Sequence, residues 1–326
     1  MTETQNNAAP VKAVLFGLDL GEYDMEKSME ELAALAEAAG MQAVAEVVQK
    51  RAVPEAATYL GEGRLAEGKL LCQNLEAQCA IFDAELSGSQ IRNLEEFLQV
   101  EVLDRTMLIL EIFARRAVTS EGKLQTELAL LRYRLPRLAG LGQSLSRQGG
   151  GGGGGAGARR GAGESKLEYD RRHVRRRIEA LSEKLAEVSR RREQARRSRQ
   201  KSGVPVIALV GYTNVGKSSL LNRMCGAGVL EADMLFATLD PTARQLTLPS
   251  GLACVAVDTV GFVSRLPHHL VEAFQSTLEE AAYADVLVRV CDASDPESAR
   301  QLAVTDEVLE SLGCGGIPTV TVYNKC

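Results

Sequence analysis

One stretch of the sequence combines glycines, a lysine and a hydroxyl at a spacing that binds phosphate. It consists of Gly211, Tyr212, Thr213, Asn214, Val215, Gly216, Lys217 and Ser218, followed by Ser219. An apolar strand is expected directly before it, at 204–210, and a helix directly after it, so the pattern G-x-x-x-x-G-K-S stands in the context it requires. Backbone N–H groups of such a loop surround the β-phosphate, and the helix N-terminus adds positive potential. We predict that these residues bind a nucleotide, with Lys217 on the β- and γ-phosphates and the Ser218 hydroxyl on Mg²⁺.

A second motif strengthens this prediction. Asp258 and Gly261 form D-x-x-G at the end of an apolar run over 252–257, about forty residues after the phosphate loop. Asp258 can hold Mg²⁺ through a water molecule, and the N–H of Gly261 can bind the γ-phosphate. The motif is weak evidence alone, but on a second strand at this distance it indicates a triphosphate site.

The segment between these motifs supplies a further candidate for the metal. It contains Phe236, Thr238 and Thr242 in the order Leu-Phe-Ala-Thr-Leu-Asp-Pro-Thr. We assign Phe236 and Thr238 to the nucleotide site and Thr238 to Mg²⁺ in the triphosphate state. Spacing does not separate Thr238 from Thr242, and either threonine alone could be a turn residue.

The end of the sequence indicates which base is bound. A strand expected at 317–322 leads into Asn324 and Lys325, which match the first half of the guanine-reading motif N-K-x-D. Asn would contact the base and Lys would pack along the phosphate loop. The motif's Asp would be residue 327, so we expect the chain to stop inside the motif, before the last strand and helix of such a domain.

The elements around these motifs indicate an α/β protein of three parts. β-rich runs at 11–18, 42–49, 79–83 and 101–103 alternate with amphipathic helices at 28–39 and 89–97, which predicts a parallel α/β domain over 1–103. No nucleophile, metal set or phosphate loop stands out there, so we interpret it as a docking or scaffold domain. The glycine cluster at 59–64 lacks phosphate-loop spacing and is expected to be a plain turn. A doubly wound, incomplete P-loop domain is expected over 203–326.

The middle part, 104–202, is expected to be an antiparallel helical hairpin. Leucines spaced four, three and four apart run from Leu124 to Leu135, and a heptad-like apolar seam runs from Leu167 to Val188. The connection between them contains seven successive glycines at 149–155, which cannot bury a core. It is either a linker or a loop that probes RNA.

The charge of the chain is concentrated in this hairpin. The formal net charge is −5, yet residues 159–201 hold 16 Lys or Arg against seven Asp or Glu. A charge run is usually a solvated helix face, but an excess of this size beside a glycine loop favours a polyanionic partner. We therefore assign Arg159 and Arg160 as RNA contacts.

Composition excludes several other classes of protein. No apolar run approaches the roughly 20 residues that span a bilayer, so no membrane span is expected. The seven cysteines form no C-x-x-C pair and are expected to be reduced thiols that serve as small packing residues. We expect a cytoplasmic protein.

Taken with these motifs, the chain resembles the HflX GTPases, a translation-factor-related family. The resemblance is most specific at 236–242, 258–262 and 273–280, and at 161–168, which is similar to the family's G-x-G-E-T-K-L-E signature with departures at Ala162 and Ser165. It covers nearly the whole chain. It implies GTP hydrolysis with Mg²⁺, binding of GTP and GDP, binding to the large ribosomal subunit and its RNA, and the splitting or rescue of stalled ribosomes. We expect a monomer.

Two positions bear on how hydrolysis is activated. Phe262 stands after Gly261, where many GTPases have a glutamine that orients water, so no catalytic residue is assigned and a slow intrinsic rate is expected. A ribosome contact or a cation would then be needed. Asn214 stands where similar cation-stimulated GTPases have an Asn that helps to hold K⁺, and it could equally make a bond that stabilises the loop.

Two alternatives remain open at the level of sequence. A P-loop ATPase acting on RNA shares every motif except the base reader, and Asn324 with Lys325 argues weakly against it. A nucleotide-gated RNA-binding or assembly protein, with incidental hydrolysis, would bind naked RNA without dependence on GTP.

Overall fold

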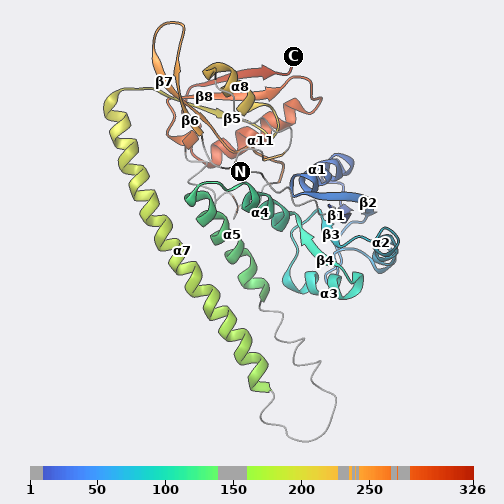
Figure 1. Cartoon of the computed structure of the whole chain (residues 1–326). Helices are drawn as coiled ribbons and strands as arrows, with labels where there is room; N and C mark the ends of the chain where they lie inside the picture. Colours follow the sequence, from blue (N-terminus) through green and yellow to red (C-terminus); the bar gives the residue numbers. More distant parts are fainter. Residues whose placement is uncertain are drawn as a thin grey trace, which may run out of the picture. The chain divides into compact units, whose positions relative to one another are not determined.

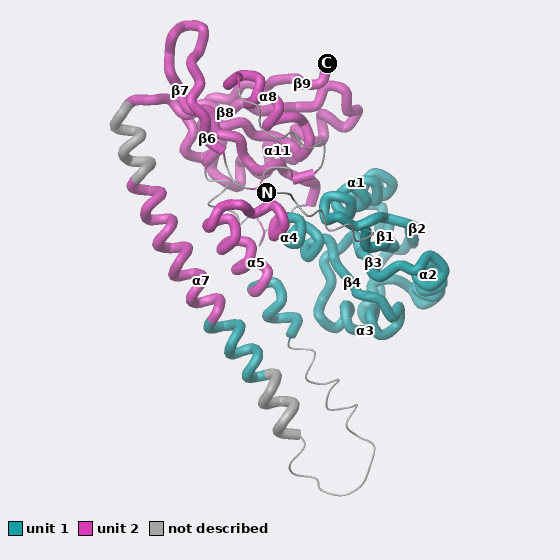
Figure 2. Tube along the Cα trace, in the orientation of Figure 1, with its two compact units in different colours: residues 1–112, 132–176 teal, residues 113–131, 177–326 magenta. Residues whose placement is uncertain are grey.

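The computed structural model describes residues 10–138, 160–226, 235–236, 239, 242–265, 270 and 280–326, without the side chains of 160–167 and 195–202. Figure 1 shows the elements, and Figure 2 shows the two compact units into which they divide. Unit 1 comprises residues 1–112 and 132–176, and unit 2 comprises 113–131 and 177–326. The boundaries between the units fall inside the helices α4, α5 and α7, which supply residues to both. The predicted division at 103 and 202 stays a proposal.

Unit 1 is built on a parallel sheet with the strand order β2-β1-β3-β4. Its elements follow one another as β1 (Val11–Asp19), α1 (Met25–Ala38), β2 (Met41–Lys50), α2 (Glu62–Asn74), β3 (Cys79–Phe82), α3 (Gly88–Leu98), β4 (Glu101–Asp104) and the start of α4 (Arg105–Arg116). This confirms the predicted parallel α/β architecture. The helices α1 and α3 begin and end within three residues of the predicted bounds.

The core of unit 1 explains why its central strand could be predicted from an apolar run in the sequence. β1 is buried almost throughout, as expected for a central parallel strand with both faces covered. The rings of Phe16 and Phe82 stack with centroids 4.7 Å apart. Each fully buried side chain of this size contributes about 1.5–3 kcal/mol, so this apolar run anchors the sheet.

One expectation for unit 1 was incomplete. The turn expected at 59–64 lies at 56–58, closed by the bridge between Glu55 and Tyr59, which has a φ of 64°, and residues 62–64 already form the first turn of α2. Only Leu65, Gly68 and Cys72 of this helix are buried. With so few apolar positions the helix left no periodic signal, so it was not predicted.

Unit 2 contains a sheet with the order β6-β7-β5-β8-β9, in which β6 is antiparallel to β7 and the other pairs are parallel. The elements are β5 (Val206–Val210), α8 (Lys217–Cys225), β6 (Thr242–Thr247), β7 (Ala253–Asp258), β8 (Val286–Asp292), α11 (Ser298–Ser311) and β9 (Thr319–Asn324). The carboxyl ends of β5, β7, β8 and β9 therefore meet at one edge of the sheet. This edge carries the predicted motifs. The strand β6 was not predicted.

Two long helices, α5 (Ser120–Leu138) and α7 (Arg160–Ser202), lie between the two sheets in the sequence. Within unit 2, Arg192 of α7 pairs with Glu121 of α5 at 2.5 Å and Arg177 pairs with Glu127 at 2.7 Å. Since the later residue of α7 pairs with the earlier residue of α5, the helices run antiparallel, as predicted.

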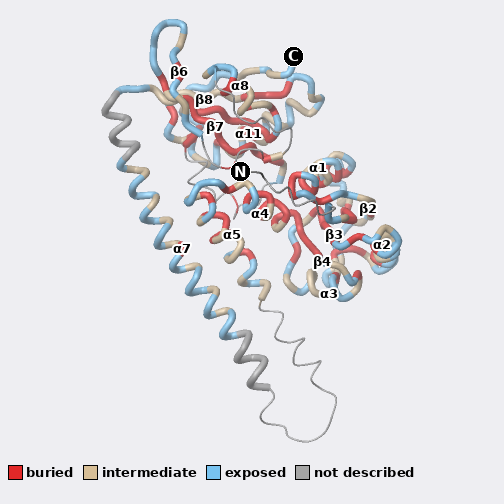
Figure 3. Tube along the Cα trace, viewed as in Figure 1, coloured by how far each residue is buried: buried red, intermediate tan, exposed pale blue. Residues whose placement is uncertain are grey.

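The apolar seam of α7 is also confirmed where its side chains are described. Ile178, Leu181, Leu185 and Val188 are less exposed than most of their neighbours, and the other side chains described between 168 and 194 are largely exposed (Figure 3). Leu167 and the glycine run at 149–155 lie outside the described side chains and residues. None of the described helices is both long and apolar enough to cross a bilayer.

Candidate nucleotide-binding site

The phosphate loop lies between β5 and α8, as its motif requires. Gly216 caps the N-terminus of α8 with a φ of 89°, a conformation that favours glycine. A Cβ atom at this position would lie 2.4 Å from Nδ2 of Asn324, so glycine is also needed for close approach. Ser219 occupies the first turn of α8. The loop thus presents backbone N–H groups at a helix N-terminus, the arrangement that binds anions.

Lys217 is buried within this loop. Its Nζ donates to the carbonyl of Tyr212 at 2.9 Å and to that of Gly211 at 3.2 Å. Burial lowers the pKa of Lys217 from 10.5 to about 8, and the nearby negative charge of Asp258 opposes this shift. The lysine is therefore a cation held in a poorly solvated place, where a phosphate would relieve the cost of its charge.

Two side chains whose oxygen atoms can ligate a metal ion lie together beside the start of α8. The hydroxyl of Ser218 donates to Oδ2 of Asp258 at 2.6 Å, joining the helix to the end of β7. Mg²⁺ prefers oxygen ligands and is commonly held by one or two protein groups together with phosphate and water. A hydroxyl and a buried carboxylate side by side fit that ion.

The segment after β7 packs directly on the phosphate loop. The N–H of Thr213 donates to the carbonyl of Phe262 at 2.7 Å, and the N–H of Phe262 donates to the carbonyl of Gly211 at 3.1 Å. A Cβ atom on Gly261 would lie 2.6 Å from Cα of Thr213 and 3.0 Å from Nζ of Lys217. Gly261 is therefore close enough to the lysine for both to reach one phosphate. Phe262 is buried, with 1% of its surface exposed.

The predicted base reader also contacts the loop. The Nδ2 of Asn324 donates to the carbonyl of Val215 at 2.8 Å, and the Nζ of Lys325 donates to the carbonyl of Asn214 at 2.8 Å. Lys325 also pairs with Asp292 at 2.8 Å. These contacts connect the end of β9 to the phosphate loop and place the two residues at one end of the site.

Asp292 was missed by the sequence analysis. Burial acts to raise its pKa, but hydrogen bonds from Lys325 and Ser294 outweigh burial and lower it below its usual value. The carboxylate is therefore ionised and holds Lys325 in place. Its position at the carboxyl end of a parallel strand could have identified it as a site residue, because ligands bind at that edge of such sheets.

The segment between the two motifs is described in part. The N–H of Phe236 donates to Oγ1 of Thr213 at 2.8 Å, which places Phe236 beside the phosphate loop. Thr242 is an exposed residue at the start of β6, opposite Asp258 in the strand register. Thr238 lies outside the described residues, so its assignment to the metal stays a prediction.

Three further assignments also stay predictions. Asn214 is exposed with a φ of 61°, and its carbonyl, rather than its side chain, makes the described bond to Lys325. Arg159 lies outside the described residues. Arg160 belongs to α7, but its side chain is not described.

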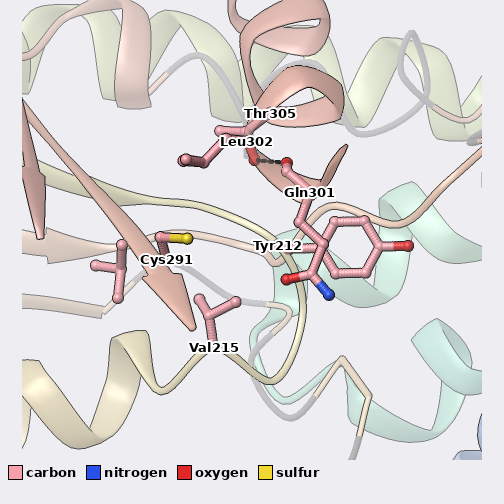
Figure 4. A pocket seen from close by; sticks show the side chains of 7 residues that line it. Tyr212, Val215, Cys291, Gln301, Leu302 and Thr305 are labelled. Carbon is pink, nitrogen blue, oxygen red and sulfur yellow. Dashed lines mark hydrogen bonds between the residues drawn. The ribbon is translucent and has the colours of Figure 1, made fainter. Parts of the chain in front are cut away.

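A small hollow lies beneath the loop and is shown in Figure 4. It is too small to hold a water molecule and is lined by Tyr212, Val215, Val290, Cys291, Gln301, Leu302 and Thr305. Burial raises the pKa of the Cys291 thiol, so this cysteine is a packing group rather than a reactive one. The hollow marks where the loop rests on β8 and α11.

Three family models match successive parts of the chain. They describe a GTP-binding GTPase N-terminal region over residues 26–114, a GTP-binding GTPase middle region over 116–199 and a 50S ribosome-binding GTPase over 206–325. The order of these matches follows the order of the predicted parts.

Curated relatives match over most of their length. GTPase HflX of Caldanaerobacter subterraneus is 51% identical over 300 residues, which cover 92% of this chain and 69% of the relative. GTPase HflX of Escherichia coli is 44% identical over 302 residues, which cover 93% of this chain and 70% of the relative. Among solved structures, the crystal structure of the SsGBP and GDP complex matches with a TM-score of 0.55 and 29% identity, covering 97% of this chain and 82% of that one.

These findings confirm the predicted fold class and the GTPase activity. The chain binds and hydrolyses GTP, so the alternative of an ATPase is set aside. Use of Mg²⁺ is general among P-loop GTPases.

Proposed function

The chain belongs to the HflX GTPase family, and on that premise we propose that it acts on the large ribosomal subunit to split or rescue stalled ribosomes. We further propose that it works in the cytoplasm as a monomer and that subunit binding stimulates its hydrolysis of GTP. The supporting observation is the charge of α7, a continuous helix of 43 residues. The matching family model, described as a 50S ribosome-binding GTPase, supports the same partner.

The exposed face of α7 is suited to a polyanion. Its apolar seam is the least exposed part of its described side chains, and other positions carry exposed basic side chains, namely Arg172, Arg175, Arg176, Lys184, Arg190 and Arg191. Arg177 is also exposed, but it pairs with Glu127 of α5. Some of these side chains pair with carboxylates on their own helix, as Arg191 does with Glu187. Exposed pairs of this kind contribute about 0–1 kcal/mol, so an RNA phosphate can replace the carboxylate at little cost.

The site residues have distinct proposed roles towards GTP. Lys217 contacts the β- and γ-phosphates, and the N–H of Gly261 donates to the γ-phosphate. Ser218 and Thr238 ligate Mg²⁺, with Asp258 holding it through water. When bound, Mg²⁺ neutralises charge on the phosphate oxygens during transfer. The loop residues 211–216 and Ser219 surround the phosphates.

The remaining roles concern recognition of the guanine base and activation of the attacking water. Asn324 contacts the base, and Lys325, fixed by Asp292, packs along the loop. Phe262 cannot orient the attacking water, so contact with the ribosome activates hydrolysis in place of the usual glutamine. A K⁺ ion held with the help of Asn214 also stimulates hydrolysis.

Binding to purified large subunits tests this function. Sedimentation should show a complex with a non-hydrolysable GTP analogue that weakens as salt is raised. Replacing Arg172 and Arg176 by Ala should flatten the slope of log K against log salt by about 0.7–0.9 for each lost phosphate contact. A matched control replaces Lys50 and Arg64, which are exposed basic residues on β2 and α2.

Each outcome of this experiment has a clear meaning. A salt slope that is flatter in the α7 variant than in the wild type, and unchanged in the control variant, supports docking through α7. Equal slopes in all three proteins, or no complex, would refute it. Binding to naked RNA that is equally tight with GTP and GDP would favour the nucleotide-gated RNA-binding or assembly protein instead.

A further inference from the structure

The basic helix α7 carries one exposed aromatic side chain. Tyr169 is the sole Phe, Tyr or Trp in the sequence of this helix, and 67% of it is exposed. A single exposed tyrosine is common on protein surfaces and needs no explanation by itself. What distinguishes Tyr169 is the chemistry of the side chains that share its face of the helix.

That face is basic over two turns. Successive residues of an α-helix are rotated by about 100°, so Arg172, His173 and Arg176 lie within about 60° of Tyr169 around the helix axis. All three are exposed. The apolar seam of α7 lies about 100–180° from Tyr169, on another side of the helix. Arg172 and Arg176 stand about 4.5 Å and 10.5 Å from Tyr169 along the axis, so the ring and the two guanidinium groups form one continuous stripe.

The side chains of this stripe are available to a partner. The nearby carboxylate of Glu168 pairs with Arg175, at 4.0 Å, rather than with an arginine of the stripe. Within the described part of the chain, Arg172 and Arg176 form no ion pair, and no aromatic ring or cationic group packs on the ring of Tyr169. A flat ring and two arginines are therefore presented together on the surface of one helix.

This combination fits single-stranded RNA better than a duplex. Proteins hold single strands by stacking bases on aromatic side chains beside a positively charged track. The bases of a duplex are stacked on one another, whereas an unpaired base in a loop or bulge can turn out and lie on a ring. We propose that Tyr169 stacks on an unpaired base of RNA while Arg172 and Arg176 contact the phosphates beside that base. The proposal rests on the proposed docking of α7 and states which feature of the RNA is recognised.

Two substitutions at Tyr169 test this role. Tyr169→Ala removes the ring from a position where alanine preserves the helix, and Tyr169→Phe keeps the ring without its hydroxyl. Sedimentation with purified large subunits and a non-hydrolysable GTP analogue, across a salt series, measures the Kd and its salt slope. The Ala variant should raise the Kd about fivefold to 150-fold, as expected for one stacked base, and the Phe variant should change it by less than about twofold. Neither variant should change the salt slope, because no charge is removed, whereas replacing Arg172 and Arg176 flattens it.

A labelled RNA oligonucleotide tests the preference for an unpaired base. Its Kd is measured as a single strand and after annealing to its complement. The wild type should bind the single strand more tightly, and Tyr169→Ala should weaken the binding of the single strand alone. Tyr283→Ala is the matched control, because Tyr283 is an exposed tyrosine outside α7. Its Kd for each RNA and for the subunit should equal that of the wild type.

The outcomes separate this proposal from the docking function on which it rests. If Tyr169→Ala binds large subunits with the wild-type Kd, stacking is overturned while the docking of α7 stands. A Phe variant as weak as Ala would assign the contact to the hydroxyl, and an equal loss in Tyr283→Ala would show that the effect is not local; either result overturns stacking on Tyr169. So does a wild type that binds the duplex as tightly as the single strand. A wild type that forms no complex with large subunits refutes the docking function itself.

Discussion

Raising the pH from 7 to 9 should weaken the binding of GDP by about tenfold, because Lys217 is buried in the phosphate loop. In the protein without nucleotide, burial lowers the pKa of this lysine to about 8. The phosphates of GDP offer the ammonium group a counter-charge, which should raise the pKa again in the complex. Binding above pH 8 therefore requires the uptake of a proton.

The size of the effect follows from the pKa. The shift from 10.5 to about 8 corresponds to a cost of about 3 kcal/mol for the charged form. The protonated fraction of the free protein falls from about 90% at pH 7 to about 10% at pH 9, which gives the tenfold change in Kd. The unfolded chain binds more protons between pH 8 and 10.5, so the free energy of unfolding of the nucleotide-free protein should increase across that window.

Calorimetric titration with GDP measures the Kd and the number of protons taken up on binding. Titrations in buffers with different ionisation enthalpies should show about one proton taken up at pH 9 and almost none at pH 7. Lys217→Arg is the matched control, because arginine stays charged at both pH values. Its affinity is expected to be lower, but its Kd should change little with pH.

Two results would refute this reasoning. One is a Kd that changes with pH equally in the wild type and the Arg variant, since the titrating group would then lie elsewhere. The other is the absence of proton uptake at pH 9, which would mean that Lys217 stays charged without nucleotide.

Three further predictions concern other parts of the protein. Ser218→Ala should abolish GTP hydrolysis while circular dichroism stays unchanged, and normal phosphate release by the folded variant would remove Ser218 from the metal site. Asp292→Asn should weaken GDP binding by about twofold to tenfold, because it removes the partner of Lys325; fluorescence titration with a labelled GDP measures this, and an unchanged Kd would contradict it. Replacing Arg159 and Arg160 by Ala should flatten the salt slope of large-subunit binding by about one to two units without changing nucleotide affinity, and a wild-type slope would make them linker residues.

The sequence was most informative where the signal is local. The strand, loop and helix of the phosphate site are contiguous, so the motif alone predicted that Lys217 would lie at the start of α8. The long apolar run of β1 was equally clear, because a strand buried on both faces needs no alternation. The seam of α7 followed from its period.

Other features depend on contacts that no local pattern encodes. The strand β6 buries only Leu246 among its six residues, so it carried little apolar signal. The bond between Thr213 and Phe236 joins residues 23 apart in the sequence, and its existence depends on how an irregular segment returns to the loop. Asp292 and Lys325 meet because β8 and β9 are neighbours in the sheet, a pairing that sequence order alone does not specify.

The rate of GTP hydrolysis, measured with and without purified large ribosomal subunits at low salt, tests most directly whether the ribosome activates this protein. Since Phe262 cannot orient water, the rate should be slow alone and should rise by at least about tenfold with the subunits. Replacing Arg172 and Arg176 should lower that stimulation and leave the rate without subunits unchanged. Hydrolysis that stays equally slow at subunit concentrations where the protein sediments with them would contradict activation by the ribosome.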